Sequence, residues 1–97
     1  LEIKEAQLGA EHLDTALGLN NLAALYRAMG RYPEAEPLYA QAVSILLQAL
    51  GLDHPNTQTV INNFVGCLQQ AVAAGEAEQL SDHPLTQALL KALGESQ

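Results

Sequence analysis

The chain repeats part of its own sequence at a spacing of 42 residues, and this repeat constrains its fold more than any other feature. Aligned with itself at that offset, the sequence has eleven identities between residues 3–38 and their counterparts, without a gap. The first members of the identical pairs are Ile3, Leu8, Gly9, His12, Thr15, Asn20, Asn21, Glu34, Ala35, Glu36 and Leu38. Because such a unit buries its apolar face by stacking on a neighbour, we expect an array of similar units.

Each unit is predicted to contain two helices. In residues 15–29 the apolar side chains recur at the spacing of one helical face, at Leu19, Leu22, Ala23 and Tyr26. Residues 33–50 carry a similar stripe, at Ala35, Leu38, Tyr39, Ala42, Ile45, Leu46 and Ala49. Gly30 and Gly51 follow these stretches, where glycine commonly ends a helix. We predict helices near 1–8, 14–29, 33–50, 56–74 and 84–93, a short turn near 76–80, and no sheet.

The repeat also suggests how the chain is divided. Residues 1–8 align with residues 43–50, so we expect them to be the tail of a preceding repeat's second helix. Residues 9–50 form one repeat, and residues 51–80 form a second, degenerate repeat. Residues 81–97 are predicted to be a capping helix, because a helical array needs an atypical last element to cover its apolar end. We therefore interpret the chain as a single domain taken from a longer protein.

The strings LNNLA at 19–23, GRYPEAEPLY at 30–39 and LGLDHPNT at 50–57 resemble the tetratricopeptide repeat, in its longer kinesin-light-chain-like form. Six residues occupy positions of the family's motif: Leu19, Leu22, Ala23, Tyr26, Ala35 and Tyr39. The second repeat departs from the motif, since it lacks the turn glycine and the tyrosine counterparts. The resemblance implies an all-α, right-handed solenoid of antiparallel helical hairpins, with no cofactor.

The resemblance also implies a function, because in this family the first helices line a concave groove that holds an extended peptide. Asn21 and Asn63 match groove residues that bond a peptide backbone, and an amide offers both a donor and an acceptor for this purpose. Neighbouring groove candidates are Asn20, Ala24 and Arg27 in one repeat and Asn62, Gly66 and Gln69 in the next. The asparagines could instead bond an adjacent helix and fix the repeat spacing, and the sequence leaves both roles open.

Charge and composition argue against several kinds of partner. The formal net charge is -7 with only four Lys or Arg residues, so neither nucleic acid nor an anionic membrane surface is an expected partner. The single cysteine, Cys67, cannot form an internal disulfide. No apolar run is long enough to span a membrane, and residues 1–5 do not resemble a signal peptide. We therefore expect a cytoplasmic location.

No group of residues predicts catalysis or metal binding. His12, His54 and His83 each stand before a predicted helix, so a repeated turn explains them better than a zinc site. Cys67 has the helical spacing of a buried apolar residue. The pairs Glu34/Glu36 and Glu76/Glu78 are predicted to lie in first helical turns, where acids offset the helix dipole.

We therefore predict a protein–protein interaction scaffold that is not an enzyme and binds a peptide or partner segment. One alternative is a structural spacer or oligomerisation segment, and another is an accessory domain of a larger enzyme or signalling protein. Self-association is also expected, because the first predicted helix would expose apolar residues such as Ile3 and Leu8.

Overall fold

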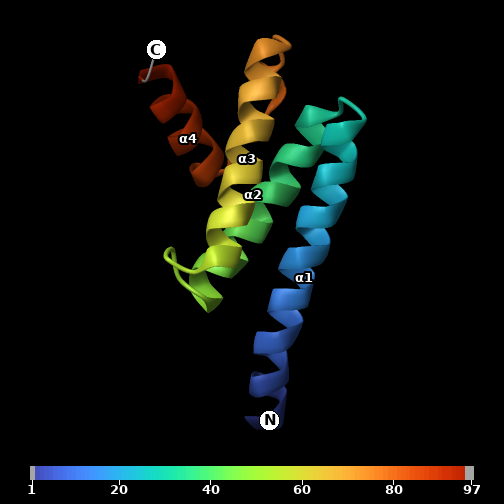
Figure 1. The fold of residues 1–97 in the computed structure, drawn as a ribbon, viewed down its shortest axis with the longest axis vertical. Helices are drawn as coiled ribbons and strands as arrows, with labels where there is room; N and C mark the ends of the chain where they lie inside the picture. Colours follow the sequence, from blue (N-terminus) through green and yellow to red (C-terminus); the bar gives the residue numbers. More distant parts are fainter. Residues whose placement is uncertain (1, 96–97) are drawn as a thin grey trace.

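Four α-helices and one short 3₁₀ turn make up the fold (Figure 1). The computed structural model describes the backbone of residues 2–95 and the side chains of residues 13–94. The elements are α1 (Glu2–Ala28), α2 (Tyr32–Ala49), α3 (Pro55–Ala73), the 3₁₀ turn η1 (Ala77–Gln79) and α4 (Pro84–Glu95). Helices α1, α2 and α3 pack as adjacent hairpins, and α4 leans against α3 near its own N-terminal end. No strand occurs among the described residues, and the predicted all-α hairpin fold is confirmed.

Helix α1 differs from the prediction, because residues 2–28 form one continuous helix where we expected two. The repeat offset explains the error. Position 55 is a proline, which starts helix α3, whereas its counterpart Leu13 is a good helix former. Nothing at Leu13 therefore forces the turn that Pro55 imposes. His12 consequently lies inside a helix and not before one, and its side chain is outside the described set.

Three glycines with positive φ follow the ends of α1, α2 and α3, namely Gly30 (77°), Gly51 (86°) and Gly75 (76°). Helices α1 and α3 end with the same backbone hydrogen bond. The residue after the glycine donates its N–H to a carbonyl in the last turn of the helix. Arg31 N–H donates to the Tyr26 carbonyl at 2.9 Å, and Glu76 N–H donates to the Ala71 carbonyl at 2.9 Å. The second repeat therefore keeps a turn glycine, because α3 continues three residues beyond the counterpart of the end of α1 and Gly75 follows it.

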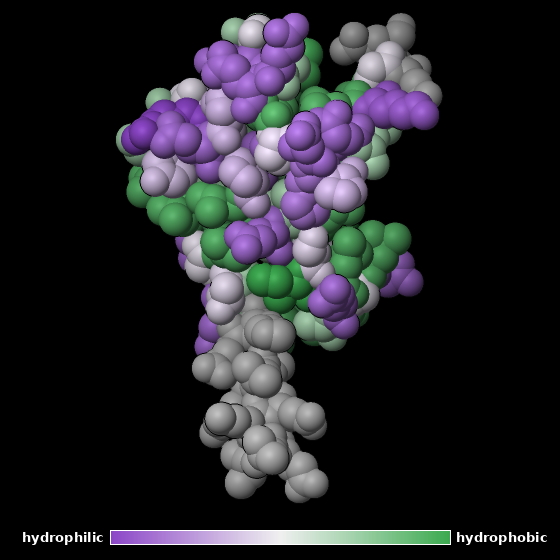
Figure 2. All heavy atoms as spheres, turned by 180° about the vertical axis from the view of Figure 1, so that it is seen from behind, coloured by the Kyte–Doolittle hydropathy of each residue, from purple (hydrophilic) through white to green (hydrophobic). Residues whose placement is uncertain are grey.

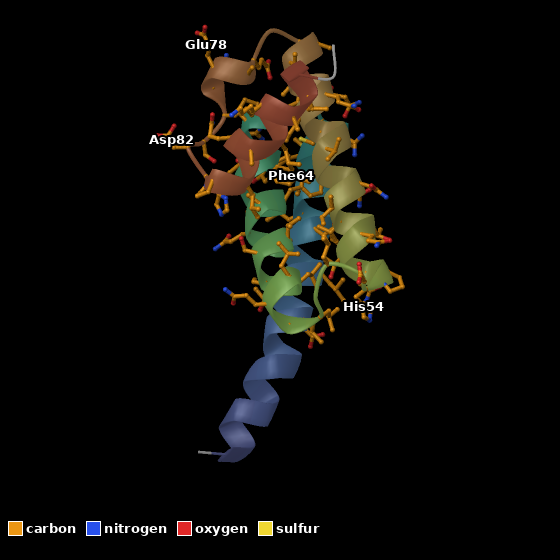
Figure 3. All side chains as sticks on the ribbon, turned by 90° about the vertical axis from the view of Figure 1, so that its left-hand side faces the viewer. His54, Phe64, Glu78 and Asp82 are labelled. Carbon is orange, nitrogen blue, oxygen red and sulfur yellow. The ribbon has the colours of Figure 1, made fainter. Side chains whose placement is uncertain are left out.

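Helices α3 and α4 begin with the same sequence, Asp-His-Pro-x-Thr-Gln, starting at Asp53 and at Asp82. His54 Nδ1 accepts a hydrogen bond from Asn56 N–H at 3.1 Å, and His83 Nδ1 accepts one from Leu85 N–H at 3.1 Å. Figure 3 shows His54 at the start of α3. The prediction that these two histidines mark helix starts is confirmed, because each caps an otherwise free helical N–H.

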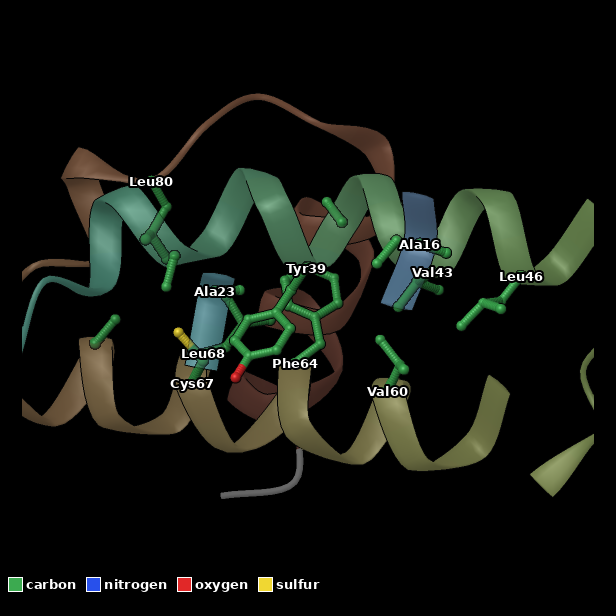
Figure 4. Packing of buried hydrophobic residues seen from close by; sticks show 14 residues of the cluster. Ala16, Ala23, Tyr39, Val43, Leu46, Val60, Phe64, Cys67, Leu68 and Leu80 are labelled. Atoms are coloured by element: carbon green, nitrogen blue, oxygen red, sulfur yellow. The ribbon is translucent and has the colours of Figure 1, made fainter. Parts of the chain in front are cut away.

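The core lies where α2 packs between α1 and α3 (Figure 4). Ala16 and Ala23 of α1 are fully buried, and their small side chains let α1 approach closely. Tyr39 of α2 stacks on Phe64 of α3, with ring centroids 6.1 Å apart and an interplanar angle of 27°. Phe64, Cys67 and Tyr39 are all fully buried, so aromatic area fills the space that the alanines leave.

Glu36 departs from the predicted position in a first helical turn, because it lies beyond the first turn of α2 and is fully buried. Its Oε1 accepts from Ser81 N–H at 2.6 Å, and its Oε2 accepts from Ser81 Oγ at 2.6 Å and from Thr86 Oγ1. Glu34 behaves as predicted: it lies in the first turn and forms an exposed ion pair with Arg31. The Glu36 carboxylate thereby joins the start of α2 to the start of α4.

Candidate functional site

The first helices of the two repeats, α1 and α3, meet along one face, and most of the predicted groove residues lie there. On α1 this face carries Asn20, Ala24 and Arg27, and on α3 it carries Asn63, Gly66 and Gln70. The residues recur three or four positions apart, the spacing that places side chains on one side of a helix. We call this face the α1–α3 face.

Arg27 makes most of the contacts across the α1–α3 face. Its Nε donates to Oε1 of Gln70, and its Nη1 donates to the backbone carbonyl of Asn63 at 3.2 Å. The guanidinium lies directly over Gly66, where an added Cβ would stand 2.6 Å from Nη2. The absence of a side chain at position 66 therefore makes room for the Arg27 guanidinium.

Two of the four candidate asparagines are hydrogen-bonded to each other across the two helices, and the other two are exposed. Asn63 Nδ2 donates to Asn20 Oδ1 at 3.3 Å, so this pair joins the two helices. Asn21 and Asn62 are exposed on the first helices of the two repeats. This hydrogen bond fixes the two side chains relative to each other, and each amide retains one further hydrogen-bonding group.

An open pocket of about 610 Å³ lies on the α1–α3 face near the C-terminal end of α1. Its lining consists of Ala24, Arg27, Ala28, Met29, Gly30, Tyr32, Tyr39, Asn63 and Gln70. Three of the predicted groove residues, Ala24, Arg27 and Asn63, therefore line one pocket. No acidic side chain is part of this lining.

Tyr39 lies at the buried side of this pocket. Its side chain is fully buried, and its Oη has no hydrogen-bond partner among the described residues. Burial raises the pKa of Tyr39 above its usual 10.0, although the nearby Arg27 guanidinium acts in the opposite direction. The phenol of Tyr39 is therefore protonated at neutral pH.

Gln69 is placed elsewhere, because it lines a smaller pocket of about 170 Å³ between α3 and α4. The other lining residues of that pocket are Val72, Leu90, Leu93 and Gly94. The prediction named Gln69 because it is the repeat counterpart of Arg27. Its neighbour Gln70 faces Arg27 instead, and the spacing of seven residues from Asn63 could have identified it.

Tyr39 was also missed as a pocket residue. The sequence placed it on the core stripe of α2, where an aromatic residue is ordinarily only a packing residue. No local signal distinguishes a core tyrosine that also lines a pocket from one that does not.

The described residues show no arrangement for metal or thiol chemistry. No group of three or more His, Cys, Asp or Glu side chains that could hold a metal ion occurs in the part of the chain that the structure describes. Cys67 is fully buried, and burial raises the pKa of its thiol to about 11. A buried and protonated thiol is a poor nucleophile at neutral pH.

None of the helices in the described part of the chain combines the length and the apolar character needed to cross a bilayer.

Comparison with known proteins bears on this arrangement of hairpins. A family model described as Tetratricopeptide repeat matches residues 15–56, which cover α1 from Thr15, all of α2 and the start of α3. The chain carries a tetratricopeptide repeat. The match spans 42 residues, the period found within the sequence, so the family resemblance stated above is confirmed. The tetratricopeptide repeat is generally a protein-interaction module and is typically non-catalytic.

One curated relative extends the similarity over nearly the whole chain. The human protein named Tetratricopeptide repeat protein 19, mitochondrial, is 32% identical over 91 residues, which is 94% of this chain. The aligned region is 23% of the relative's length, so this chain corresponds to a small part of that protein. No solved structure matches the chain.

Proposed function

We propose that this tetratricopeptide repeat chain is a non-catalytic scaffold that holds an extended peptide or partner segment on the α1–α3 face. The pocket there carries the proposal, since it gathers two amide side chains, a guanidinium and small residues in one open depression. Amides can pair with a peptide backbone, and Ala24 and Gly30 leave space for peptide side chains.

Peptide capture tests the proposal. Arrays of 12-residue peptides would be probed with the 97-residue chain and with its Asn21→Ala/Asn63→Ala variant, with circular dichroism to confirm that both are folded. Gln41→Ala/Gln48→Ala is a matched control, because it removes two exposed amides from α2 instead. We expect the chain and the control to capture the same peptides, and the Asn variant to lose them. Equal capture by all three would mean that the asparagines are structural.

An exposed apolar stripe on α1 supports a second candidate, a spacer or oligomerisation segment. Leu22, Leu25 and Met29 are 42%, 57% and 54% exposed and lie on one side of the helix. Hydrophobic surface is visible along α1 in the view from behind (Figure 2). The repeat counterparts of these residues are Phe64, Cys67 and Ala71, and all three are fully buried. A neighbouring helix or a second copy that covers the stripe would bury it in the same way.

The proposal extends to how the chain is divided and where it acts. We propose that residues 1–8 belong to a preceding repeat and that residues 81–97 cap the array. We also propose a cytoplasmic location, although the human relative carries the word mitochondrial in its name. Fractionation of cells that express the full-length protein, with a tag at its C-terminus, would decide between the two compartments.

A further inference from the structure

Residues 75–79 connect α3 to the segment that leads into α4, and their sequence favours a structure that they do not adopt. Residues 76–78 repeat the Glu-Ala-Glu tripeptide of residues 34–36, which is α-helical in α2. In the second repeat this tripeptide lies instead at the 3₁₀ turn η1, after Gly75 has turned the chain with a φ of 76°. A Cβ added at Gly75 would have no other atom within 4 Å, so side-chain packing does not fix the turn. We call residues 75–79 the hinge, because a helical φ at Gly75 would let α3 continue through them.

The chain from Leu80 onward docks on α2 and α3 as one contiguous unit. Leu80 is buried in the core. Ser81 and Thr86 donate three hydrogen bonds to the buried carboxylate of Glu36, and we call this set the Glu36 contact. The leucines of α4 are only partly buried, and an open pocket of about 170 Å³ lies between α3 and α4. Figure 1 shows α4 at the edge of the fold, where it diverges from α3.

We propose that residues 80–94 swap between two copies of this chain, so that the α4 of each copy docks on the α2–α3 surface of the other. In the swapped dimer the hinge continues α3 as a helix. Two swapped chains keep the same two α4 contacts as two closed chains and add the helical hydrogen bonds of the hinge. Swapping an identical element is therefore a low-cost route to a symmetric dimer. This self-association uses neither the α1–α3 face nor the apolar stripe of α1.

The hinge also determines when the swap occurs. In a closed chain it holds residues 80–94 beside their own docking surface, and a short tether of this kind gives an effective concentration in the millimolar range. The swapped dimer should therefore become abundant only near about 1 mM chain, or when the hinge no longer favours the closed form.

Two complementary variants of the full chain test the swap. One carries Glu36→Ala and lacks the acceptor of the Glu36 contact, and the other carries Ser81→Ala/Thr86→Val and lacks its hydroxyl donors. Neither variant alone can form the intact contact, whether closed or swapped. A mixed swapped dimer forms one intact contact, because the unit of the first variant docks on the carboxylate of the second. Both variants would also carry Leu25→Glu/Met29→Glu, which opposes association through the apolar stripe of α1.

We expect mixing at about 1 mM to give about tenfold more dimer than either variant forms alone, measured by sedimentation. Hydrogen–deuterium exchange then identifies the docked helix. When only the Glu36→Ala chain is isotope-labelled, its α4 amides should exchange with solvent more slowly after the other variant is added. When only the Ser81→Ala/Thr86→Val chain is labelled, its α4 amides should stay fast, because no carboxylate receives its α4.

Alanine substitution of the hinge glycine tests the swap with the Glu36 contact intact. Gly75→Ala, in the same Leu25→Glu/Met29→Glu background, should favour a continuous α3 and raise the dimer fraction. Gly30→Ala is the matched control, since Gly30 has a similar φ of 77° and open space around it but leads into α2. The control should leave the dimer fraction unchanged.

Three results would overturn the swap. The first is no gain of dimer when the two complementary variants are mixed. The second is slower hydrogen exchange of α4 in both labelled chains, because that pattern means association elsewhere on the molecule. The third is an equal dimer fraction in Gly75→Ala and Gly30→Ala. Circular dichroism would confirm that each variant is folded, and Glu36→Gln, which keeps the size of the side chain, would replace Glu36→Ala if the latter unfolds.

Discussion

Gly18 and Gly30 differ in backbone conformation but not in the space around them. A Cβ added at either position would have no other atom within 4 Å. Gly18 lies in the middle of α1, where glycine weakens a helix. Gly30 has a φ of 77°, a conformation that other residues adopt at a cost. Substitutions at these two positions therefore report the effect of backbone conformation on stability without a contribution from side-chain packing.

Alanine substitution at these two positions should change stability in opposite directions. Gly18→Ala should raise the free energy of unfolding by about 0.5–1 kcal/mol, and Gly30→Ala should lower it by about 1 kcal/mol. Urea unfolding followed by circular dichroism measures both. A Gly30→Ala variant as stable as the parent chain would show that the turn tolerates a negative φ.

Cys67 should be protected from alkylation as long as the chain is folded. The thiol is fully buried and its pKa is raised by burial to about 11 from its usual 9.0. The folded state holds this proton more tightly, so the thiol stabilises the fold below about pH 9, and the effect is lost as pH rises through about 11. Iodoacetamide at pH 8 should react roughly a hundred times more slowly in buffer than in urea. Comparable rates would show that the core opens readily.

At the scale of elements, the buried carboxylate of Glu36 holds both the start of α4 and the segment that leads into it. Three donors from Ser81 and Thr86 converge on it. Apolar residues of α4 complete the contact, and they are only partly buried: Leu85, Leu89, Leu90 and Leu93. The position of α4 should thus depend strongly on Glu36.

Replacing Glu36 should loosen α4 much more than replacing its neighbour Glu34. Glu36→Ala leaves buried donors unpaired and should cost about 2–3 kcal/mol. Glu34→Ala removes one exposed ion pair and should cost less than about 1 kcal/mol. Hydrogen exchange of the α4 amides reports the effect locally, and it should accelerate in Glu36→Ala only. Equal exchange in both variants would show that the apolar contacts alone hold α4.

The helices themselves could be predicted because their apolar residues recur at helical spacing and glycines mark their ends. The continuity of α1 through Leu13 was not predicted, because Leu13 aligns with Pro55 in the repeat and a helix start was therefore expected near it. Glu36 was misinterpreted because an acid near a helix start is ordinarily solvated. Its burial arises from Ser81 and Thr86, which lie far along the chain.

The candidate site was predicted in part for the same physical reason. The repeat placed Asn20, Ala24, Arg27, Asn63 and Gly66 on first helices, and the structure brings them to one face. The angle and distance between α1 and α3 decide which asparagines form a hydrogen bond between the two helices. A single sequence does not specify that angle or that distance. The burial of the Tyr39 hydroxyl depends on the same packing.

At the scale of the whole molecule, α1 presents an apolar stripe whose repeat counterparts are buried, so the chain should associate through it. Leu25→Glu/Met29→Glu should shift the sedimentation coefficient toward that of a monomer, because charge opposes burial of that surface. Leu52→Glu is a suitable control, since Leu52 is also exposed but lies in the turn before α3. Unchanged association in the double variant would exclude the stripe as the contact.

Site-directed photocrosslinking tests peptide binding on the α1–α3 face most directly. A benzophenone amino acid would replace Ala24, which lines the pocket, or Gln41, which is exposed on α2. Each folded variant would be irradiated with the 12-residue peptides that the array selects. We predict a crosslinked peptide at position 24 and none at position 41. Crosslinking at position 41 alone, or equally at both positions, would contradict binding on this face.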